Sequence, residues 1–162
     1  MFKKIFKKKE ELSWLVPLTG EVKLITEAPD PVFAQKMMGD GFCVDPTSGK
    51  VCSPVKGEIV SIFPTKHAIG IMSDTGHEIL IHFGIDTVNL NGEGFTLLVS
   101  TGDKIEAGQL LIEVDIDSIK DKIPSLITAV VITNLENKSV DISKLGEAKQ
   151  GDTITLEIKS DC

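Results

Sequence analysis

Residues 76–88 read Gly-His-Glu-Ile-Leu-Ile-His-Phe-Gly-Ile-Asp-Thr-Val, and the rest of the chain can be interpreted outward from this stretch. Apolar side chains at positions 79, 81 and 83 alternate with Leu80 and His82, which is the period-two pattern of a half-buried β-strand, and Gly84 then interrupts it. Successive side chains of a strand point to opposite faces, so His82 should lie on the face opposite the isoleucines, at the strand end. By the same parity, His77 should point away from His82.

The body of the chain alternates turn signals with short aliphatic runs. Turn signals rich in Gly, Asp, Asn and Pro recur throughout residues 46–152, and aliphatic runs lie between them, for example at 58–63, 68–72, 95–99 and 110–114. Short strands separated by such turns are typical of antiparallel all-β folds. The sequence therefore predicts an antiparallel β-sandwich or flattened barrel.

Two short helices are expected within this β-pattern. Asp30 is a favourable N-cap, Pro31 suits the first helical position, and the helix that they begin should stop at Gly39. A second short helix is predicted over residues 118–123, capped by Asp117 and closed by Pro124.

The chain divides into an N-terminal segment, residues 1–16, and a single β-sandwich domain, residues 17–162. Within residues 1–9, Phe2, Ile5 and Phe6 lie at helical spacing among five lysines. Such a segment is either a disordered, solubilising tail or a basic amphipathic stretch that makes weak contact with an anionic membrane surface. Both interpretations stay open.

Charge restricts the kinds of partner. The chain has 17 cations, all lysine, against 24 acids, a net charge of −7; five of those lysines precede residue 10, so residues 10–162 carry 12 cations, 24 acids and a net charge of −12. Such a surface repels nucleic acid and attracts a basic protein. Without arginine, a bound phosphate must be held by histidine, lysine, hydroxyl groups or backbone amides.

Targeting signals and cysteine usage point to the cytoplasm. No apolar run approaches the ~18 residues of a membrane helix. Charged residues occupy the place of a signal peptide's apolar region. Cys43, Cys52 and Cys162 lack the spacing of a zinc knuckle or a redox pair, so free thiols are expected.

Two of the three histidines, His67 and His82, occupy strand positions beside apolar residues. A histidine in such a position is about as often a structural core residue as a reactive group. Thr65 lies two residues before His67, on the same strand face, where its hydroxyl can orient the imidazole. Gly84 and Asp86 leave an open polar edge beside His82, which favours a functional role.

Three ordered segments carry a resemblance to a known family: residues 65–71 (Thr-Lys-His-Ala-Ile-Gly-Ile), residues 76–88, and residues 90–95 (Leu-Asn-Gly-Glu-Gly-Phe). Together they resemble the glucose-type IIA proteins of the bacterial phosphoenolpyruvate-dependent sugar phosphotransferase system, over about residues 17–159. This resemblance implies a β-sandwich phosphocarrier, which is a phosphotransferase component that requires no cofactor.

The resemblance also implies a role for each site residue. His82 would accept a phosphoryl group from the phosphohistidine of the donor protein HPr and pass it to the IIB domain of a glucose-type sugar permease. His67 would stabilise the phosphate, and Thr65 would hydrogen-bond His67. A neutral imidazole, with a pKa of about 6.5, has a free lone pair that can attack phosphorus without a separate base.

A docking face around His82 follows from the same resemblance. Two acids and seven apolar side chains would border the ring and meet the protein partners. The acids are Asp30 and Asp86, and the apolar side chains are Val32, Phe33, Met37, Met38, Phe63, Leu80 and Val88.

Three other classes of function share some features with this sequence. Zinc hydrolases of related β-architecture need three protein ligands and an open position, and His67 with His82 is an incomplete set, although incidental zinc binding by this pair stays open. A regulatory binding module, acting on transporters or kinases, is the second class. A biotin or lipoyl carrier is disfavoured because no Met-Lys-Met tip is present.

Overall fold

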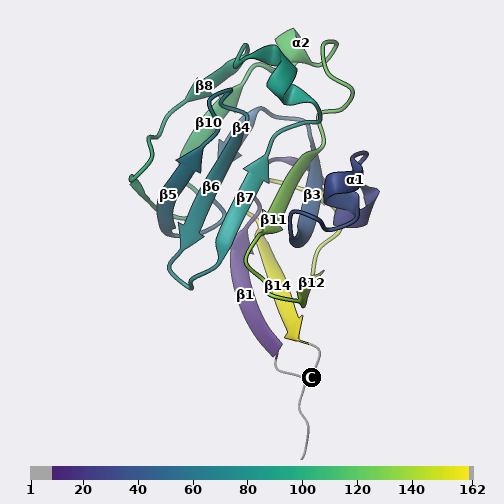
Figure 1. The fold of residues 1–162 in the computed structure, drawn as a ribbon, viewed down its shortest axis with the longest axis vertical. Helices are drawn as coiled ribbons and strands as arrows, with labels where there is room; N and C mark the ends of the chain where they lie inside the picture. The colour runs from purple at the N-terminus through teal and green to yellow at the C-terminus, as the bar shows by residue number, and fades with distance from the viewer. Residues whose placement is uncertain (1–8, 161–162) are drawn as a thin grey trace, which may run out of the picture.

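The structure is a computed structural model that describes residues 9–160, and strands dominate it (Figure 1). The elements in chain order are β1 (Lys9–Leu15), β2 (Gly20–Leu24), η1 (Ile25–Glu27), α1 (Pro31–Ala34), β3 (Asp40–Pro46), β4 (Lys50–Cys52), β5 (Gly57–Ile62), β6 (Ala68–Ser73), β7 (Glu78–His82), η2 (Thr87–Leu90), β8 (Phe95–Leu97), β9 (Lys104–Ile105), β10 (Leu110–Val114), α2 (Ile116–Ile119), β11 (Thr128–Ile132), β12 (Lys138–Ile142), β13 (Gly146–Ala148) and β14 (Thr153–Ser160).

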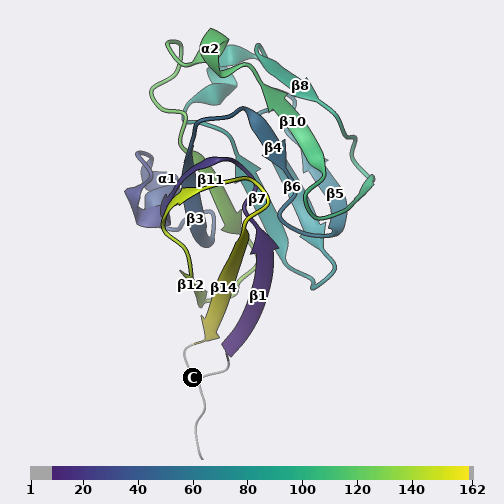
Figure 2. The same cartoon turned by 180° about the vertical axis from the view of Figure 1, so that it is seen from behind.

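Three antiparallel sheets make up the fold of the described residues. The largest has the strand order β13-β2-β3-β11-β7-β6-β5-β9, and two smaller sheets have the orders β4-β10-β8 and β1-β14-β12. Seen from behind, β1 and β14 of one small sheet and β4 and β10 of the other lie in front of the central strands of the large sheet (Figure 2). This layered arrangement confirms the predicted antiparallel β-sandwich with short helices.

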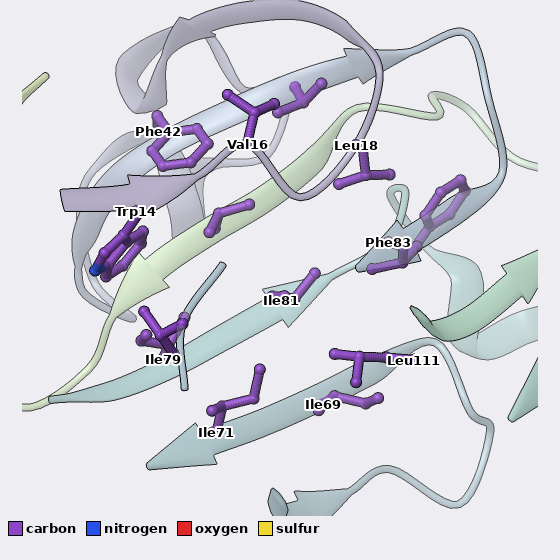
Figure 3. Packing of buried hydrophobic residues seen from close by; sticks show 14 of the residues in the cluster. Trp14, Val16, Leu18, Phe42, Ile69, Ile71, Ile79, Ile81, Phe83 and Leu111 are labelled. Carbon is purple, nitrogen blue, oxygen red and sulfur yellow. The ribbon is translucent and has the colours of Figure 1, made fainter. Parts of the chain in front are cut away.

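The main core lies between these layers. Isoleucines at positions 69 and 71 of β6 and 79 and 81 of β7 are buried, and they point toward Trp14, Leu18 and Leu111 of the opposing layer (Figure 3). Their side chains alternate along each strand because a strand presents every second residue to one face. The prediction that the isoleucines of β7 face the core is therefore confirmed.

The opposite face of the large sheet buries a second, smaller cluster. Leu80 of β7 packs there with Phe33 of α1 and with small or branched side chains of β3, β6 and β11. Figure 1 shows α1 lying beside β3 and β11, where it covers part of this face. His82 shares the parity of Leu80, so it lies at the edge of this second cluster rather than in the main core.

The folded body begins earlier than the predicted boundary at residue 17. Residues 9–15 form β1, which pairs antiparallel with β14, from Lys9 opposite Lys159 to Leu15 opposite Thr153. The sequence pattern does not indicate this strand, because charged residues interrupt its apolar alternation and its partner lies at the far end of the chain. Residues 1–8, which contain most of the basic amphipathic stretch, lie outside the described residues, and the division of the chain into domains stays a prediction.

Both helices begin close to their predicted positions but are shorter or shifted. α1 starts at Pro31 as expected, yet it ends at Ala34 instead of continuing to Gly39, because Lys36 adopts a left-handed backbone conformation (φ 61°). Met37 and Met38 are therefore not helical. α2 starts at residue 116, two residues before the predicted start, because Asp115 and not Asp117 is its N-cap, and it ends at Ile119 instead of residue 123.

Cys43 and Cys52 are buried free thiols, as predicted, and burial raises the pKa of Cys43 to about 12. Cys162 lies outside the described residues. Among residues 9–160, no helix has the length and apolar character needed to cross a membrane.

The buried carboxylate of Asp40 ties the large sheet to β12, and its loss should destabilise the fold. Its oxygens accept hydrogen bonds from the amides of Gly41 and Val140, each at 2.8 Å, and Lys36 lies 3.4 Å away. Asp40→Ala leaves these buried donors without an acceptor, so the free energy of unfolding should fall by about 2–3 kcal/mol in urea titrations. Asp121→Ala, at an exposed position, is the control; equal unfolding midpoints for both variants would contradict this role.

Candidate functional site

His82 is the last residue of β7, between two strands that carry small side chains. It pairs with Ala68 of β6 on one side and with Ala129 of β11 on the other. Paired residues of neighbouring strands project to the same face, so the two alanines leave space for an imidazole. The ring is half-buried.

A single hydrogen bond determines the tautomer of His82. Its Nδ1 lies 3.0 Å from the carbonyl oxygen of Gly84. A carbonyl oxygen only accepts, so Nδ1 of the neutral ring carries the proton and Nε2 carries the lone pair. Gly84 has a φ of +71°, and a Cβ placed there would lie 2.9 Å from Ile123 Cδ1 and 2.9 Å from Thr87 Oγ1. Glycine is therefore required for this turn.

A second imidazole lies against the first. The ring centroids of His67 and His82 are 4.7 Å apart, with the planes nearly perpendicular at 83°. The side chain of His67 is buried, and its Nδ1 lies 2.6 Å from the hydroxyl oxygen of Thr65. The predicted association of these three residues is thus observed.

Two phenylalanines pack around the histidine pair. Phe33 lies against His82, with ring centroids 5.0 Å apart. Phe63 meets both histidines edge-on, with centroid distances of 5.5 Å to His67 and 6.4 Å to His82. These rings exclude water from one side of the pair and restrict the orientation of both imidazoles.

Burial lowers the pKa of both histidines. Desolvation first and the charge of His82 second lower the pKa of His67 to about 4, while a hydrogen bond to Thr65 opposes them. Desolvation also lowers the pKa of His82, although the hydrogen bond to Gly84 and the charge of Asp30 oppose this effect. Both imidazoles are therefore neutral at pH 7, and Nε2 of His82 keeps its lone pair.

The two predicted acids differ in their surroundings. Asp30 caps α1, since its Oδ1 accepts a hydrogen bond from the amide of Val32 at 2.9 Å, and its charge acts on His82. Asp86 is exposed and precedes η2 in a left-handed conformation, with a φ of 57°. Asp30 therefore contributes to the field at the ring, and Asp86 lies in the turn beyond it.

The predicted apolar docking residues fall into two groups. Five have exposed side chains: Val32, Met37, Met38, Phe63 and Val88. Phe33 and Leu80 are 4% and 6% exposed, so they form the floor beneath His82 and offer almost no surface to a partner. Sequence analysis could not separate them, because the covering helix α1 had first to be placed over the sheet.

Met37 and Met38 also border a hollow of about 290 Å³ that is lined from β11 by Ile132. Ile132 pairs with Ile79, whereas His82 pairs with Ala129, so this hollow lies toward the opposite end of β11. Phe63 contacts both histidine rings, whereas the hollow that Met37 and Met38 border lies away from them.

His77 is separate from the pair, as its parity predicted. Its Nδ1 lies 2.7 Å from the hydroxyl of Thr75, and its Nε2 lies 3.4 Å from a carboxylate oxygen of Glu10 on β1. The side chain of His77 therefore contacts the hairpin between β6 and β7 and also β1, and it lies apart from the histidine pair.

Sequence reasoning missed two parts of the site, the Gly84 carbonyl and the paired alanines. A backbone acceptor leaves no trace in residue identity, and the alanines become neighbours of His82 only through strand register. Among residues 9–160, no group of three or more His, Cys, Asp or Glu side chains is arranged to hold a metal ion. The pair alone offers two nitrogen ligands, one fewer than a catalytic zinc site has.

The buried neutral state of His67 should make stability pH-dependent. An unfolded imidazole has a pKa of about 6.5, and the folded value is about 4. Between these values the unfolded state binds more protons, so the free energy of unfolding should fall as pH drops from about 6.5 to 4, by on the order of 3 kcal/mol. Urea titrations across this range test the effect: His67→Gln should show a smaller slope than wild type and than His77→Gln, and three equal slopes would contradict it.

Comparisons with known proteins all point to one family. The family model of the phosphoenolpyruvate-dependent sugar phosphotransferase system, EIIA 1, matches residues 12–138. The glucose-specific EIIA component of the phosphotransferase system from Halalkalibacterium halodurans is 47% identical, and that from Staphylococcus aureus strain N315 is 44% identical, each over 98% of both chains. The solved structure of glucose permease IIA from Mycoplasma capricolum superposes with a TM-score of 0.85 and 41% identity, covering 91% of this chain and 96% of that one. The family prediction is confirmed: this chain belongs to the EIIA 1 family of the phosphoenolpyruvate-dependent sugar phosphotransferase system.

Proposed function

We propose that this phosphocarrier of the sugar phosphotransferase system carries its phosphoryl group on Nε2 of His82. The phosphocarrier role follows from family membership. The choice of atom rests on one observation, the hydrogen bond between His82 Nδ1 and the Gly84 carbonyl, which leaves the lone pair on Nε2. HPr is the proposed donor, and the IIB domain of a glucose-type permease is the proposed acceptor.

Uptake of the phosphoryl group is an exchange of one phosphorus–nitrogen bond for another. Nε2 of His82 attacks the phosphorus of the donor's phosphohistidine, a bond from Nε2 to phosphorus forms, and the donor's bond from nitrogen to phosphorus breaks as the electron pair returns to the donor ring. The proton on Nδ1 stays in place, and its bond to the Gly84 carbonyl strengthens as the ring gains positive charge. In the onward step a nucleophile of the IIB domain attacks the phosphorus, a bond from that nucleophile to phosphorus forms, and the bond from Nε2 to phosphorus breaks as its electron pair returns to the His82 ring. No cofactor takes part.

His67 is proposed to stabilise the phosphoryl group. When the Thr65 hydroxyl donates to Nδ1 of His67, the proton of this neutral ring lies on Nε2, which can then donate to a phosphoryl oxygen. A donor held in place before the reaction stabilises transition-state charge without reorganisation. Thr65 thus orients His67, and the short centroid distance of 4.7 Å places His67 beside the reacting ring.

The exposed surface around His82 is proposed to dock both partners in turn. Val32, Phe63 and Val88 supply its apolar part, while Asp30 and Asp86 supply negative charge. The net charge of −12 over residues 10–162 attracts a basic donor, and rim charges of this kind act chiefly on the association rate. Desolvation of the ring by the docked partner keeps hydrolysis slow.

Replacement of the acceptor should abolish phosphorylation. His82→Gln cannot form a phosphorus–nitrogen bond at this position, so incubation with phosphoenolpyruvate and the general phosphotransferase components should leave it unlabelled. His77→Gln is the matched control, because His77 lies five residues away on the other face, and it should be labelled like wild type. Mass spectrometry locates the phosphate; stoichiometric labelling of the His82→Gln variant at another histidine would refute the assignment.

His67 should matter more for passing the phosphoryl group on than for receiving it. His67→Gln should still be labelled by HPr, because the lone pair of His82 is unchanged, but transfer to the IIB domain should slow by about 100-fold, the effect of losing one placed donor. Rapid-quench measurements of both half-reactions provide the test. Equal onward rates for wild type and variant would rule out this role.

A further inference from the structure

Thr87 is a buried hydroxyl residue next to the site, and no step described so far uses it. It is the first residue of η2, and none of its surface is exposed. Its Oγ1 donates a hydrogen bond to the carbonyl oxygen of Phe83. Phe83 lies between His82 and Gly84, so this bond acts on the short segment that sets the tautomer of His82.

Hydrogen bonds hold the backbone on both sides of Gly84. The amide of Phe83 donates to the carbonyl of His67 at 2.8 Å, and the amide of Ile85 donates to the carbonyl of Ser125 at 2.9 Å. The peptide group between Gly84 and Ile85 therefore points its N–H at Ser125 and its carbonyl at His82. The preceding peptide group, between Phe83 and Gly84, is held through its carbonyl by Thr87.

The conformation at Gly84 must be fixed by its neighbours. Glycine has no side chain to restrict φ and ψ, and its φ of +71° is one of several that it can adopt. Thr87 Oγ1 lies 2.9 Å from the place that a Cβ of Gly84 would occupy, so Thr87 packs directly on this residue as well as holding the adjoining carbonyl.

We propose that Thr87 is a positioning residue for phosphoryl transfer, because it keeps the Gly84 carbonyl directed at Nδ1 of His82. This inference rests on the proposed role of His82 as acceptor. Without the Thr87 hydroxyl, the carbonyl of Phe83 loses the hydrogen bond that holds the peptide group before Gly84. The Ile85–Ser125 bond then remains to hold the peptide group after it, so the Gly84 carbonyl points at the ring for a smaller share of the time. The ring then populates its other neutral tautomer, in which a proton occupies Nε2, the attacking atom.

Two pairs of variants isolate the hydroxyl of Thr87. The first pair is wild type and Thr87→Val, which have nearly the same shape and differ in the hydroxyl. The second pair is Thr87→Ser and Thr87→Ala, which also differ in the hydroxyl, and neither places a Cγ methyl group beside the Phe83 carbonyl. Nitrogen-15 NMR of the imidazoles reports the tautomer of His82 directly. The proton should stay on Nδ1 in wild type and in the Ser variant, and the Val and Ala variants should show a mixture of tautomers.

The phosphorylation rate gives a second readout. Phosphoryl uptake from HPr should slow by about five- to tenfold in the Val and Ala variants, the size of one neutral hydrogen bond, and Thr87→Ser should restore it. Ser53→Ala is the control, because Ser53 is a buried hydroxyl that donates to the Val55 carbonyl at 2.6 Å, outside the site. It should lower stability without changing the tautomer or the rate.

The outcomes separate this inference from the proposed function. If the Val and Ala variants fold and keep the wild-type tautomer, the inference is overturned, even where their stability and rate fall, because Thr87 is then only structural. If the Val variant fails to fold, the Ser and Ala variants provide the test: the inference is overturned if both show the wild-type tautomer of His82. If wild type is not labelled at His82, the proposed function fails, whereas the NMR comparison still shows whether Thr87 orients the ring.

Discussion

The hydrogen bond from His82 to the Gly84 carbonyl is the interaction on which the site depends. It requires a left-handed glycine, because any Cβ at that position would collide with Ile123 and Thr87. It also requires alanines on both flanking strands, since larger side chains would displace the ring. The proton on Nδ1 of His82 thus depends on three features together: the sheet register, the turn after β7 and the packing of η2.

Burial has two effects on the histidine pair that serve the same chemistry. Desolvation keeps both rings neutral at pH 7, which preserves the attacking lone pair and removes repulsion between imidazoles in contact. The phenylalanines that pack against the pair also exclude water, so hydrolysis has less opportunity to compete with transfer. A more exposed pair would be easier to protonate and easier to hydrolyse.

Local sequence patterns predicted the strand face of His82 and the start of α1. They did not predict the features that depend on backbone conformation or on contacts between distant parts of the chain. The period-two alternation around Leu80 correctly placed His82 opposite the isoleucines, and Asp30 before Pro31 marked the start of α1. The early end of α1 depends on a left-handed lysine, which residue identity does not signal. β1 was missed because its partner lies far along the chain. The burial of Phe33 depends on how α1 covers the sheet.

The pairing of β1 with β14 has a consequence for how this carrier can be joined to other proteins. Lys9 lies opposite Lys159, so the chain enters and leaves the described body at one place, while β7 runs away from that end toward His82 (Figure 1). A covalent tether at either end would therefore join the described body at nearly the same point, away from the reactive ring. Fusion to a permease, at whichever end, would raise the local concentration of carrier at its acceptor without changing the chemistry.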